Sequence, residues 1–183
     1  MWDTSIPKIH LAMHLDSLNA LREHVLPEKY GWRFFEPGDG MHWARIETSA
    51  GEFACEADAL ARFRREFFTD DGLEERMIFL TESGVPFATA TAWMDSAEQG
   101  HLHYVAIDDA HQGQGLCRPL VYIALKRMAE LGHSCAHLTT QTYSWAAIKV
   151  YHDFGFHPVP FHEDDEAGWK LVSQKTCIPF ELK

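Results

Sequence analysis

The chain has 183 residues, of which 46% are hydrophobic and 23% charged, and this composition favours a single globular domain with a sizeable core. The formal net charge is −11, from 16 Lys and Arg against 27 Asp and Glu, and no basic cluster offsets it, so we expect no nucleic-acid partner. No signal-peptide pattern, membrane-length apolar stretch or CxxC pair is present. We therefore expect a cytoplasmic protein with reduced thiols and no membrane partner.

The first part of the chain is predicted to be an extension, a strand and two helices. The extension covers residues 1–29, and Pro27 ends its helix. The last helix of this part carries apolar side chains at helical spacing, which is typical of a helix packed on a core. The expected elements are a helix around His10–Leu26, a strand over Tyr30–Glu36, and helices near Met41–Thr48 and over Glu56–Phe68.

A hairpin and two strand–helix pairs are predicted to follow. The turn Glu82-Ser83-Gly84 joins the strands of the hairpin, and Gly132 ends the first helix. Thr142 or Ser144 is expected to cap the second helix. The expected elements are strands over Arg76–Thr81, Val85–Trp93, His101–Ile107 and Cys135–Thr140, helices over Gly115–Leu131 and Ser144–Asp153, and a strand that begins at Phe156.

The C-terminal residues are predicted to add one or two further strands. The acidic run Glu163–Glu166 is expected to be a solvated loop, and strands within Lys170–Leu182 could pair across a homodimer. The order of elements predicts an α/β fold of the mixed α+β kind, with helices on the faces of the sheet. Residues 1–29 would be an N-terminal helical extension and residues 30–183 the main domain.

The most informative segment joins a strand to a glycine-containing turn and then to an amphipathic helix. Gly113 and Gly115 bare the backbone in this turn, and a helix N-terminus presents unpaired N–H groups and the positive end of the helix dipole. The turn therefore predicts a ligand with a diphosphate group, bound by main-chain amides over Gln112–Arg118. Asp108 and Asp109 precede the turn and must point away from the phosphates.

The run Gln112-Gly-Gln-Gly-Leu-Cys117 resembles the Gln/Arg-x-x-Gly-x-Gly/Ala motif of the GCN5-related N-acetyltransferases (GNAT), although Cys117 stands where the family usually has Gly or Ala. The resemblance implies a GNAT-like fold with its core signature at residues 76–157. It would have a central, mostly antiparallel sheet, splayed middle strands and helices on both faces. The resemblance also implies acetyl-CoA as cofactor, with the pantetheine arm on Val105, Ala106 and Ile107 and the diphosphate on Gln112, Gly113, Gln114, Gly115, Leu116, Cys117 and Arg118.

A second segment, Ala147-x-x-x-Tyr151-x-x-x-Gly155-Phe156, resembles the Ala-x-x-x-Tyr-x-x-x-Gly-Phe pattern of the same family. Many members carry Asn three residues before the Ala, where this chain has Ser144. The resemblance adds Ser144 and Tyr151 to the cofactor site. A phenol can hydrogen-bond the departing sulfur or give it a proton, so Tyr151 is predicted to be catalytic. The alternative is a tyrosine that only packs in the core.

His101 and His103 alternate along one strand, so their side chains point to the same face. An imidazole can remove the proton that an ammonium group must lose before it attacks. The strand looks like that of the arylalkylamine N-acetyltransferases, where a His-x-His pair relays a proton, so both histidines are catalytic candidates. A structural histidine and a proton route through water are the alternatives. No HExxH or zinc-finger spacing is present, so no metal is expected.

The chain is thus predicted to be a transferase that moves an acetyl group from acetyl-CoA to a primary amine of a small-molecule or peptide acceptor by direct attack. A non-catalytic acyl-CoA-binding or sensor domain is the alternative; it would keep the turn but bind no acceptor. A nicotinamide-dependent enzyme is a third interpretation, although the predicted elements lack the regular alternation of a dinucleotide fold. The identity of the acceptor and the oligomeric state stay open.

Overall fold

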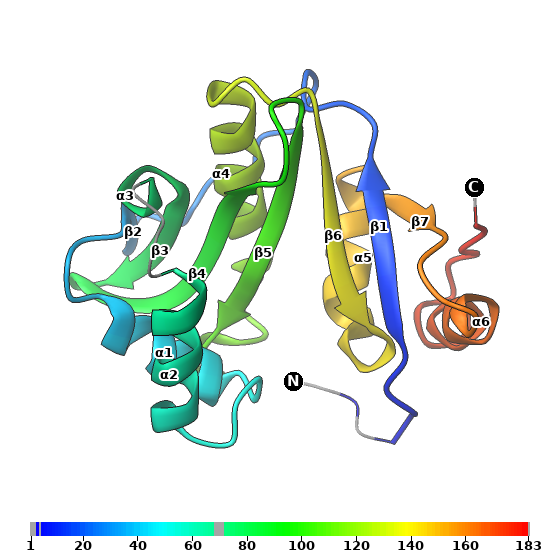
Figure 1. Cartoon of the computed structure of the whole chain (residues 1–183), viewed down its shortest axis with the longest axis horizontal. Helices are drawn as coiled ribbons and strands as arrows, with labels where there is room; N and C mark the ends of the chain where they lie inside the picture. The colour runs from blue at the N-terminus through cyan, green and yellow to red at the C-terminus, as the bar shows by residue number, and fades with distance from the viewer. Residues whose placement is uncertain (1–2, 4, 68–71, 183) are drawn as a thin grey trace.

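The computed structural model describes residues 3, 5–67 and 72–182. Their strands are β1 (His10–Leu15), β2 (Tyr30–Phe34), β3 (Met77–Glu82), β4 (Val85–Met94), β5 (Gln99–Ile107), β6 (Cys135–Gln141) and β7 (His157–Val159). They form one mixed sheet in the order β2-β3-β4-β5-β6-β1-β7 (Figure 1). All neighbours in this sheet are antiparallel except β5 and β6, which run parallel. The expected mixed α/β fold is confirmed.

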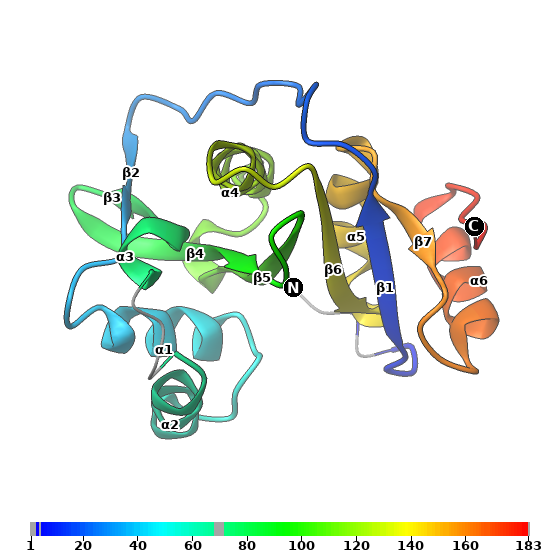
Figure 2. The same cartoon turned by 45° about the horizontal axis from the view of Figure 1, so that its top comes forward.

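The helices are α1 (Gly40–Ser49), α2 (Glu56–Glu66), α3 (Leu73–Arg76), α4 (Cys117–Glu130), α5 (Trp145–Asp153) and α6 (Asp165–Thr176), with short 3₁₀ turns η1 (Asp109–His111) and η2 (Thr142–Ser144). α4 covers one face of β4 and β5, and α1 and α2 lie on the opposite face (Figure 2). Two core clusters correspond to these two faces, one containing Leu120 and Ile148, the other Trp43 and Phe79. No helix in the described part of the chain is long and apolar enough to span a membrane.

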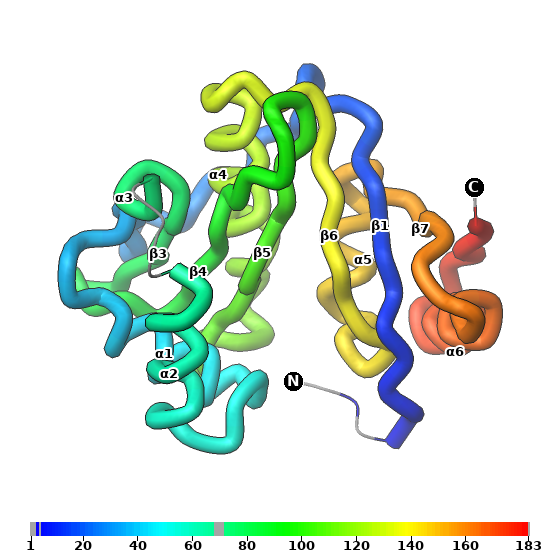
Figure 3. The backbone as a smooth tube through the Cα atoms, in the orientation of Figure 1, coloured from blue at the N-terminus to red at the C-terminus, as the bar shows by residue number. Residues whose placement is uncertain are grey.

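The two middle strands, β5 and β6, pair over only part of their length (Figure 3). Their parallel ladder joins Gln99–His101 to Cys135–His137, whereas β5 continues to Ile107 and β6 to Gln141. Beyond the ladder the strands diverge, and both contribute residues to the wall of one cavity. The splayed middle strands expected from the sequence are therefore present.

A β-bulge in β5 reorients two side chains beside this divergence. Thr89 pairs with Ala106 but Thr91 pairs with His103, so β5 contains one more residue than β4 over the same interval. Tyr104 has a φ of 48°, which is uncommon for a residue with a Cβ. Consecutive side chains of a regular strand face opposite sides, but here those of His103 and Tyr104 hydrogen-bond one carboxylate.

The predicted helix around His10–Leu26 is wrong, because residues 10–15 form β1. Leu11, Met13 and Leu15 are buried at the two-residue spacing of a strand. β1 pairs with β6 on one side and β7 on the other, and both partners lie far downstream in the chain. These non-local hydrogen bonds decide the conformation. The division of the chain at residue 29 itself stays a prediction.

The strands predicted within Lys170–Leu182 are also wrong, because residues 165–176 form α6. Gly168 and Val172 are buried at helical spacing. A Cβ at Gly168 would lie 2.8 Å from the side chain of Leu11, so the glycine allows α6 to pack closely on β1. A glycine within the helix weakens the local helical signal, and the contact with β1 compensates for it.

The acidic run predicted to be a solvated loop instead contains the start of α6. Asp165 is 3% exposed and accepts hydrogen bonds from the backbone N–H groups of Phe161 and His162, the latter at 2.9 Å. A carboxylate at a helix N-terminus also interacts favourably with the helix dipole. Because residues 165–176 form a helix, the C-terminal strands that were expected to pair across a homodimer are not formed. A homodimer itself stays a prediction.

The other predicted elements are confirmed, with ends that move by a few residues. The predicted end of the second helix, Phe68, lies outside the described residues. Ser144 is the N-cap residue of α5 but makes no side-chain cap hydrogen bond. The hydroxyl of Thr142 instead accepts from the N–H of Ile9 at 3.1 Å and donates to the carbonyl of Pro7. Thr142 therefore fixes the segment before β1, and neither of the two expected caps is formed.

Candidate functional site

A cavity of about 650 Å³ opens where β5 and β6 diverge. Its wall combines these strands with the turn before α4, the start of α5, and residues of α1 and α2. This volume is typical of small-molecule and cofactor sites. The predicted site residues that line the cavity are His103, Val105, Ala106, Ile107, Gln112, Gly113, Gly115, Leu116, Cys117, Arg118, Ser144 and Tyr151.

The turn before α4 presents its backbone to one end of the cavity. Gly113 and Gly115 have φ values of 75° and 78°, a left-handed conformation that residues with a Cβ rarely adopt. No atom lies within 4 Å of a Cβ placed on either glycine, so the backbone conformation, not crowding within the chain, requires glycine. α4 begins at Cys117, and its N-cap residue Leu116 offers no side-chain acceptor. The free amides of this first turn, together with the helix dipole, can bind an anion.

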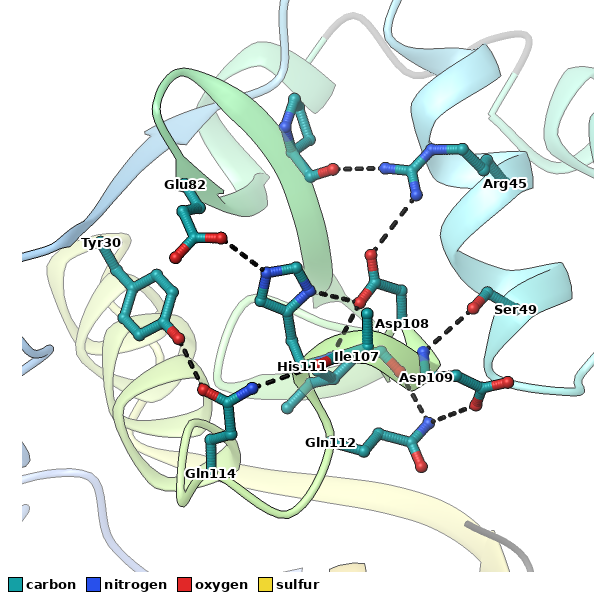
Figure 4. Close-up of polar contacts among 12 residues, drawn as sticks. Tyr30, Arg45, Ser49, Glu82, Ile107, Asp108, Asp109, His111, Gln112 and Gln114 are labelled. Carbon is teal, nitrogen blue, oxygen red and sulfur yellow. Dashed lines mark hydrogen bonds and ion pairs between the residues drawn. The ribbon is translucent and has the colours of Figure 1, made fainter.

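A hydrogen-bond network centred on Asp108 and His111 holds this turn in place (Figure 4). Asp108 is 7% exposed, its Oδ1 lies 2.5 Å from His111 Nδ1, and its Oδ2 lies 3.4 Å from Arg45 Nη1. The other ring nitrogen of His111 lies 3.2 Å from Glu82 Oε2. Asp108 does not line the cavity, and Arg45 compensates its charge. This acidic residue therefore does not face an anion bound at the turn.

The two glutamines of the turn take different positions (Figure 4). Gln112 lines the cavity, and its Nε2 donates to the carbonyl of Ile107 at 2.9 Å. Gln114 does not line the cavity, because its side chain accepts from the hydroxyl of Tyr30 at 2.8 Å and donates to the carbonyl of Ala110 at 3.1 Å. The side chain of Gln114 thus stabilises the turn, and only its backbone is left for a ligand.

Cys117 and Arg118 start α4 beside the cavity. Burial raises the pKa of the Cys117 thiol to about 11, so the thiol stays protonated at neutral pH and adds no negative charge next to the amides. Arg118 Nη2 lies 2.5 Å from Asp153 Oδ2, and both side chains are 41% exposed. The arginine is therefore paired within the protein, at a solvent-exposed position next to the turn.

Tyr151 lies on α5, lines the cavity and is 6% exposed. Burial raises the pKa of its hydroxyl far above the ordinary value, and Cys117 and Glu47 raise it further. The phenol therefore keeps its proton at neutral pH. Because Tyr151 lines the cavity, its hydroxyl proton can meet a ligand bound there.

His103 and Tyr104 share one carboxylate at the other end of the cavity-lining part of β5. His103 Nε2 lies 2.7 Å from Glu66 Oε1, and the Tyr104 hydroxyl donates to Glu66 Oε2 at 3.0 Å. Burial lowers the pKa of His103, and the hydrogen bond to Glu66 only partly opposes this effect. A neutral imidazole that donates Nε2–H to a carboxylate has its Nδ1 lone pair available as a base.

His101 lies behind His103 and does not line the cavity. Its ring centroid is 4.7 Å from that of His103 and 4.3 Å from that of His137. Burial, followed by the nearby His103 and His137, lowers the pKa of His101 to about 3, so its imidazole is neutral. Of the two predicted catalytic histidines, the fold brings only His103 to the cavity.

The model of the acetyltransferase (GNAT) family matches residues 27–156, a range that contains both segments singled out in the sequence and most of the cavity wall. The chain belongs to the GNAT family. The mixed sheet of this chain, whose middle strands separate around a cavity, therefore has the GNAT fold.

Known GNAT proteins resemble this chain in sequence or in fold. Over 129 residues the chain is 26% identical to the mycothiol acetyltransferase of Mycobacteroides abscessus, an alignment that covers 67% of this chain and 44% of that protein. The chain spans less than half the length of the curated relatives it matches. A GCN5-related N-acetyltransferase from Sphaerobacter thermophilus has a similar fold, with a TM-score of 0.69, 18% identity, and coverage of 82% of this chain and 48% of that one.

The fold also resembles that of yncA from Salmonella typhimurium, whose structure was solved with its cofactor acetyl-CoA. The TM-score is 0.52 and the identity 19%, with coverage of 70% of this chain and 79% of that chain. At these identities the structural similarities establish the GNAT fold.

The residues of the GNAT cavity that the sequence patterns missed include Glu47, Glu52, Arg62 and His10. Glu47 on α1 is 2% exposed, and its Oε1 has no hydrogen-bond partner among the described residues. Burial raises the pKa of this carboxyl well above its ordinary value, and Glu52 adds to the effect. No motif marks these positions, because α1, α2 and β1 reach the cavity only through tertiary packing.

Proposed function

We propose that this chain is an acetyl-CoA-dependent N-acetyltransferase that moves the acetyl group to a primary amine of a small molecule or peptide by direct attack. The proposal is carried by the cavity, which brings together an uncapped helix N-terminus, a buried phenol and an imidazole bound to a carboxylate. Membership of the GNAT family and the acetyltransferase names of its relatives support it.

The turn before α4 fits the diphosphate of acetyl-CoA. Backbone amides over residues 113–118 and the dipole of α4 would bind the phosphates without a dedicated lysine. The backbone of Val105, Ala106 and Ile107, on the side of β5 that β6 leaves unpaired, would bind the pantetheine arm as an added strand does, with Ser144 on the facing wall. Bound there, acetyl-CoA supplies an acetyl group activated as a thioester.

Tyr151 would assist the departing sulfur. The new C–N bond forms as the C–S bond breaks, and negative charge develops on the sulfur. Because burial raises the pKa of Tyr151, its hydroxyl stabilises this charge mainly as a hydrogen-bond donor, before any complete proton transfer.

His103 would accept the proton that the attacking amine loses. Its Nδ1 receives the proton, while the bond from Nε2 to Glu66 fixes the tautomer and stabilises the imidazolium that forms. His101, whose ring lies 4.7 Å away, is the candidate for passing this proton on, in competition with solvent.

Glu47 and Glu52 would attract the acceptor amine in its cationic form. Both line the cavity, and Glu47 is close enough to Tyr104 and Tyr151 to raise the pKa of both hydroxyls. A buried carboxyl without a partner costs free energy that a bound ammonium group can offset. The acceptor is therefore expected to carry a positive charge.

Acetyl-CoA consumption by the full chain, measured as release of free thiol across a panel of primary amines, tests this function. We expect turnover of at least one amine, with kcat falling about 100-fold in Tyr151→Phe and the Kd of acetyl-CoA unchanged. Tyr122→Phe, a half-buried tyrosine on α4 off the cavity, is the matched control. Tight acetyl-CoA binding without turnover of any amine would instead identify an acyl-CoA sensor.

A further inference from the structure

A row of histidines crosses the sheet at one register. His101 on β5 is opposite His137 on β6, His137 is opposite His14 on β1, and His14 is opposite His157 on β7. Residues paired across strands share a face of the sheet, so the four imidazoles lie side by side. Each of them is half-buried, whereas their sequence neighbours Leu102, Leu138 and Leu15 point into the core.

Two of these histidines form a potential chelating cluster with Asp95, which follows β4. One potential ligand atom from each of Asp95, His101 and His137 lies within 4.8 Å of the other two. The rings of His101 and His137 stack with centroids 4.3 Å apart, and His137 Nε2 is 3.5 Å from Asp95 Oδ2. The three side chains come from three different segments, and the sheet fixes their spacing.

The cluster leaves ring nitrogens without partners. His101 Nε2 and His137 Nδ1 are buried, and no hydrogen-bond partner is found for either among the described residues. An orphaned buried nitrogen costs free energy, which a metal–ligand bond would recover at His101, whereas His137 faces Asp95 with its other nitrogen, Nε2. The other pair in the row differs, because the Nε2 atoms of His14 and His157 lie 3.6 and 3.1 Å from the exposed carboxylate of Asp16.

We propose that Asp95, His101 and His137 bind one divalent transition-metal ion, with Zn²⁺ as the best-fitting ion. Two imidazoles and one carboxylate are a ligand set that zinc accepts, with the fourth position left to water. Tetrahedral zinc separates its ligand atoms by about 3.3 Å, since its bonds to N and O are about 2.0–2.1 Å long. The stacked rings must therefore rotate about their side-chain bonds, and the exposed Asp95 can follow.

This site would lie beside the catalytic cavity rather than in it. The His101 ring is 4.7 Å from the ring of His103, which lines the cavity, whereas Asp95 and His137 do not line it. The ion would not touch the acetyl group or the diphosphate turn. A His101 imidazole bound to the ion would not also pass on a proton from His103, but metal binding itself can be measured without a substrate.

Isothermal titration of the untagged, EDTA-stripped full chain with zinc chloride tests the proposal. We expect one equivalent of Zn²⁺ to bind, and Co²⁺ to give visible d–d bands of a tetrahedral site. Asp95→Ala and His137→Ala should each weaken binding at least about tenfold. His162→Ala, which removes an exposed histidine elsewhere, should leave the Kd unchanged.

Asp95→Ala keeps the test decisive if His137→Ala fails to fold, because Asp95 has a side-chain exposure of 55% and contributes little to the core. No zinc binding by the wild-type chain, or the same Kd in wild type and Asp95→Ala, would overturn the proposal. Neither result would bear on acetyl transfer.

Discussion

The two ends of the cavity are built in different ways. The proposed diphosphate end is one continuous segment, in which the glycines of a turn and the first amides of α4 would supply the binding groups. The proposed acceptor end gathers His103, Glu47, Glu52 and Glu66 from three segments that meet only in the folded chain. The first end relies on backbone geometry, and the second on side-chain charge. Changes at the two ends should therefore have different kinetic effects.

Removal of the proposed base should have the largest effect. His103→Ala is expected to lower kcat at least about 100-fold at neutral pH, because the amine then loses its proton only to water. The Kd of acetyl-CoA, measured by titration, should stay within about twofold, since His103 lies at the acceptor end. His24→Ala, away from the cavity, is the control. An unchanged kcat would show that water or another group is the base.

A change in the turn before α4 should instead affect the Kd of acetyl-CoA. Gly115→Val forces a β-branched residue into a φ of 78°, so the turn must rearrange. We expect the Kd of acetyl-CoA to rise at least about tenfold, which corresponds to 1.4 kcal/mol, with little change in the KM of the acceptor. Gly84→Val also falls at a positive φ but in the β3–β4 hairpin, and it should leave the Kd unchanged. Equal acetyl-CoA affinity in Gly115→Val would contradict the role of the turn.

Loss of the carboxylate behind His103 should have a smaller effect with a distinct signature. Glu66 raises the pKa of His103 against the effect of burial, so Glu66→Gln should lower that pKa. A base acts when deprotonated, so the acidic limb of kcat/KM against pH should move to lower pH, while kcat falls several-fold as orientation is lost. An unmoved limb in Glu66→Gln would argue against this pairing. Glu75→Gln, at an exposed position, should reproduce the wild-type profile.

The smallest expected effect concerns stability. Glu47 has a folded-state pKa raised by burial, so folding favours its protonated form and the free energy of unfolding should fall as pH rises above the ordinary pKa of Glu. Glu47→Gln should remove this pH dependence and raise the free energy of unfolding at pH 7 by about 1 kcal/mol, while it raises the KM of a cationic acceptor. Urea titrations at pH 5 and pH 8 measure it. An identical pH dependence in the variant would show that Glu47 is not the titrating group.

The elements that could be predicted from the sequence are those whose signal lies within one short segment. The glycines of the turn and the apolar spacing of α4 and α5 are contained in short segments, so these elements and the cavity-lining Tyr151 follow from the sequence. β1 was mistaken for a helix because its partners β6 and β7 lie far along the chain. α6 was missed because Gly168, which weakens a helix, is explained only by its contact with β1.

At the proposed acceptor end, too, only the residue with a local signal could be predicted. His103 could be proposed from its strand, but its partner Glu66 lies on α2, and the bulge that places Tyr104 beside that carboxylate has no sequence motif. In the sequence Glu47 is one of several polar residues of a helix, and only the folded structure shows that it is buried beside the cavity.

A crystal structure of the full chain with coenzyme A would show directly where the cofactor binds. We expect the diphosphate on the backbone amides of residues 113–118, and the sulfur within hydrogen-bond reach of the Tyr151 hydroxyl. Coenzyme A bound elsewhere, or a sulfur remote from Tyr151 with the turn free of phosphate, would contradict it.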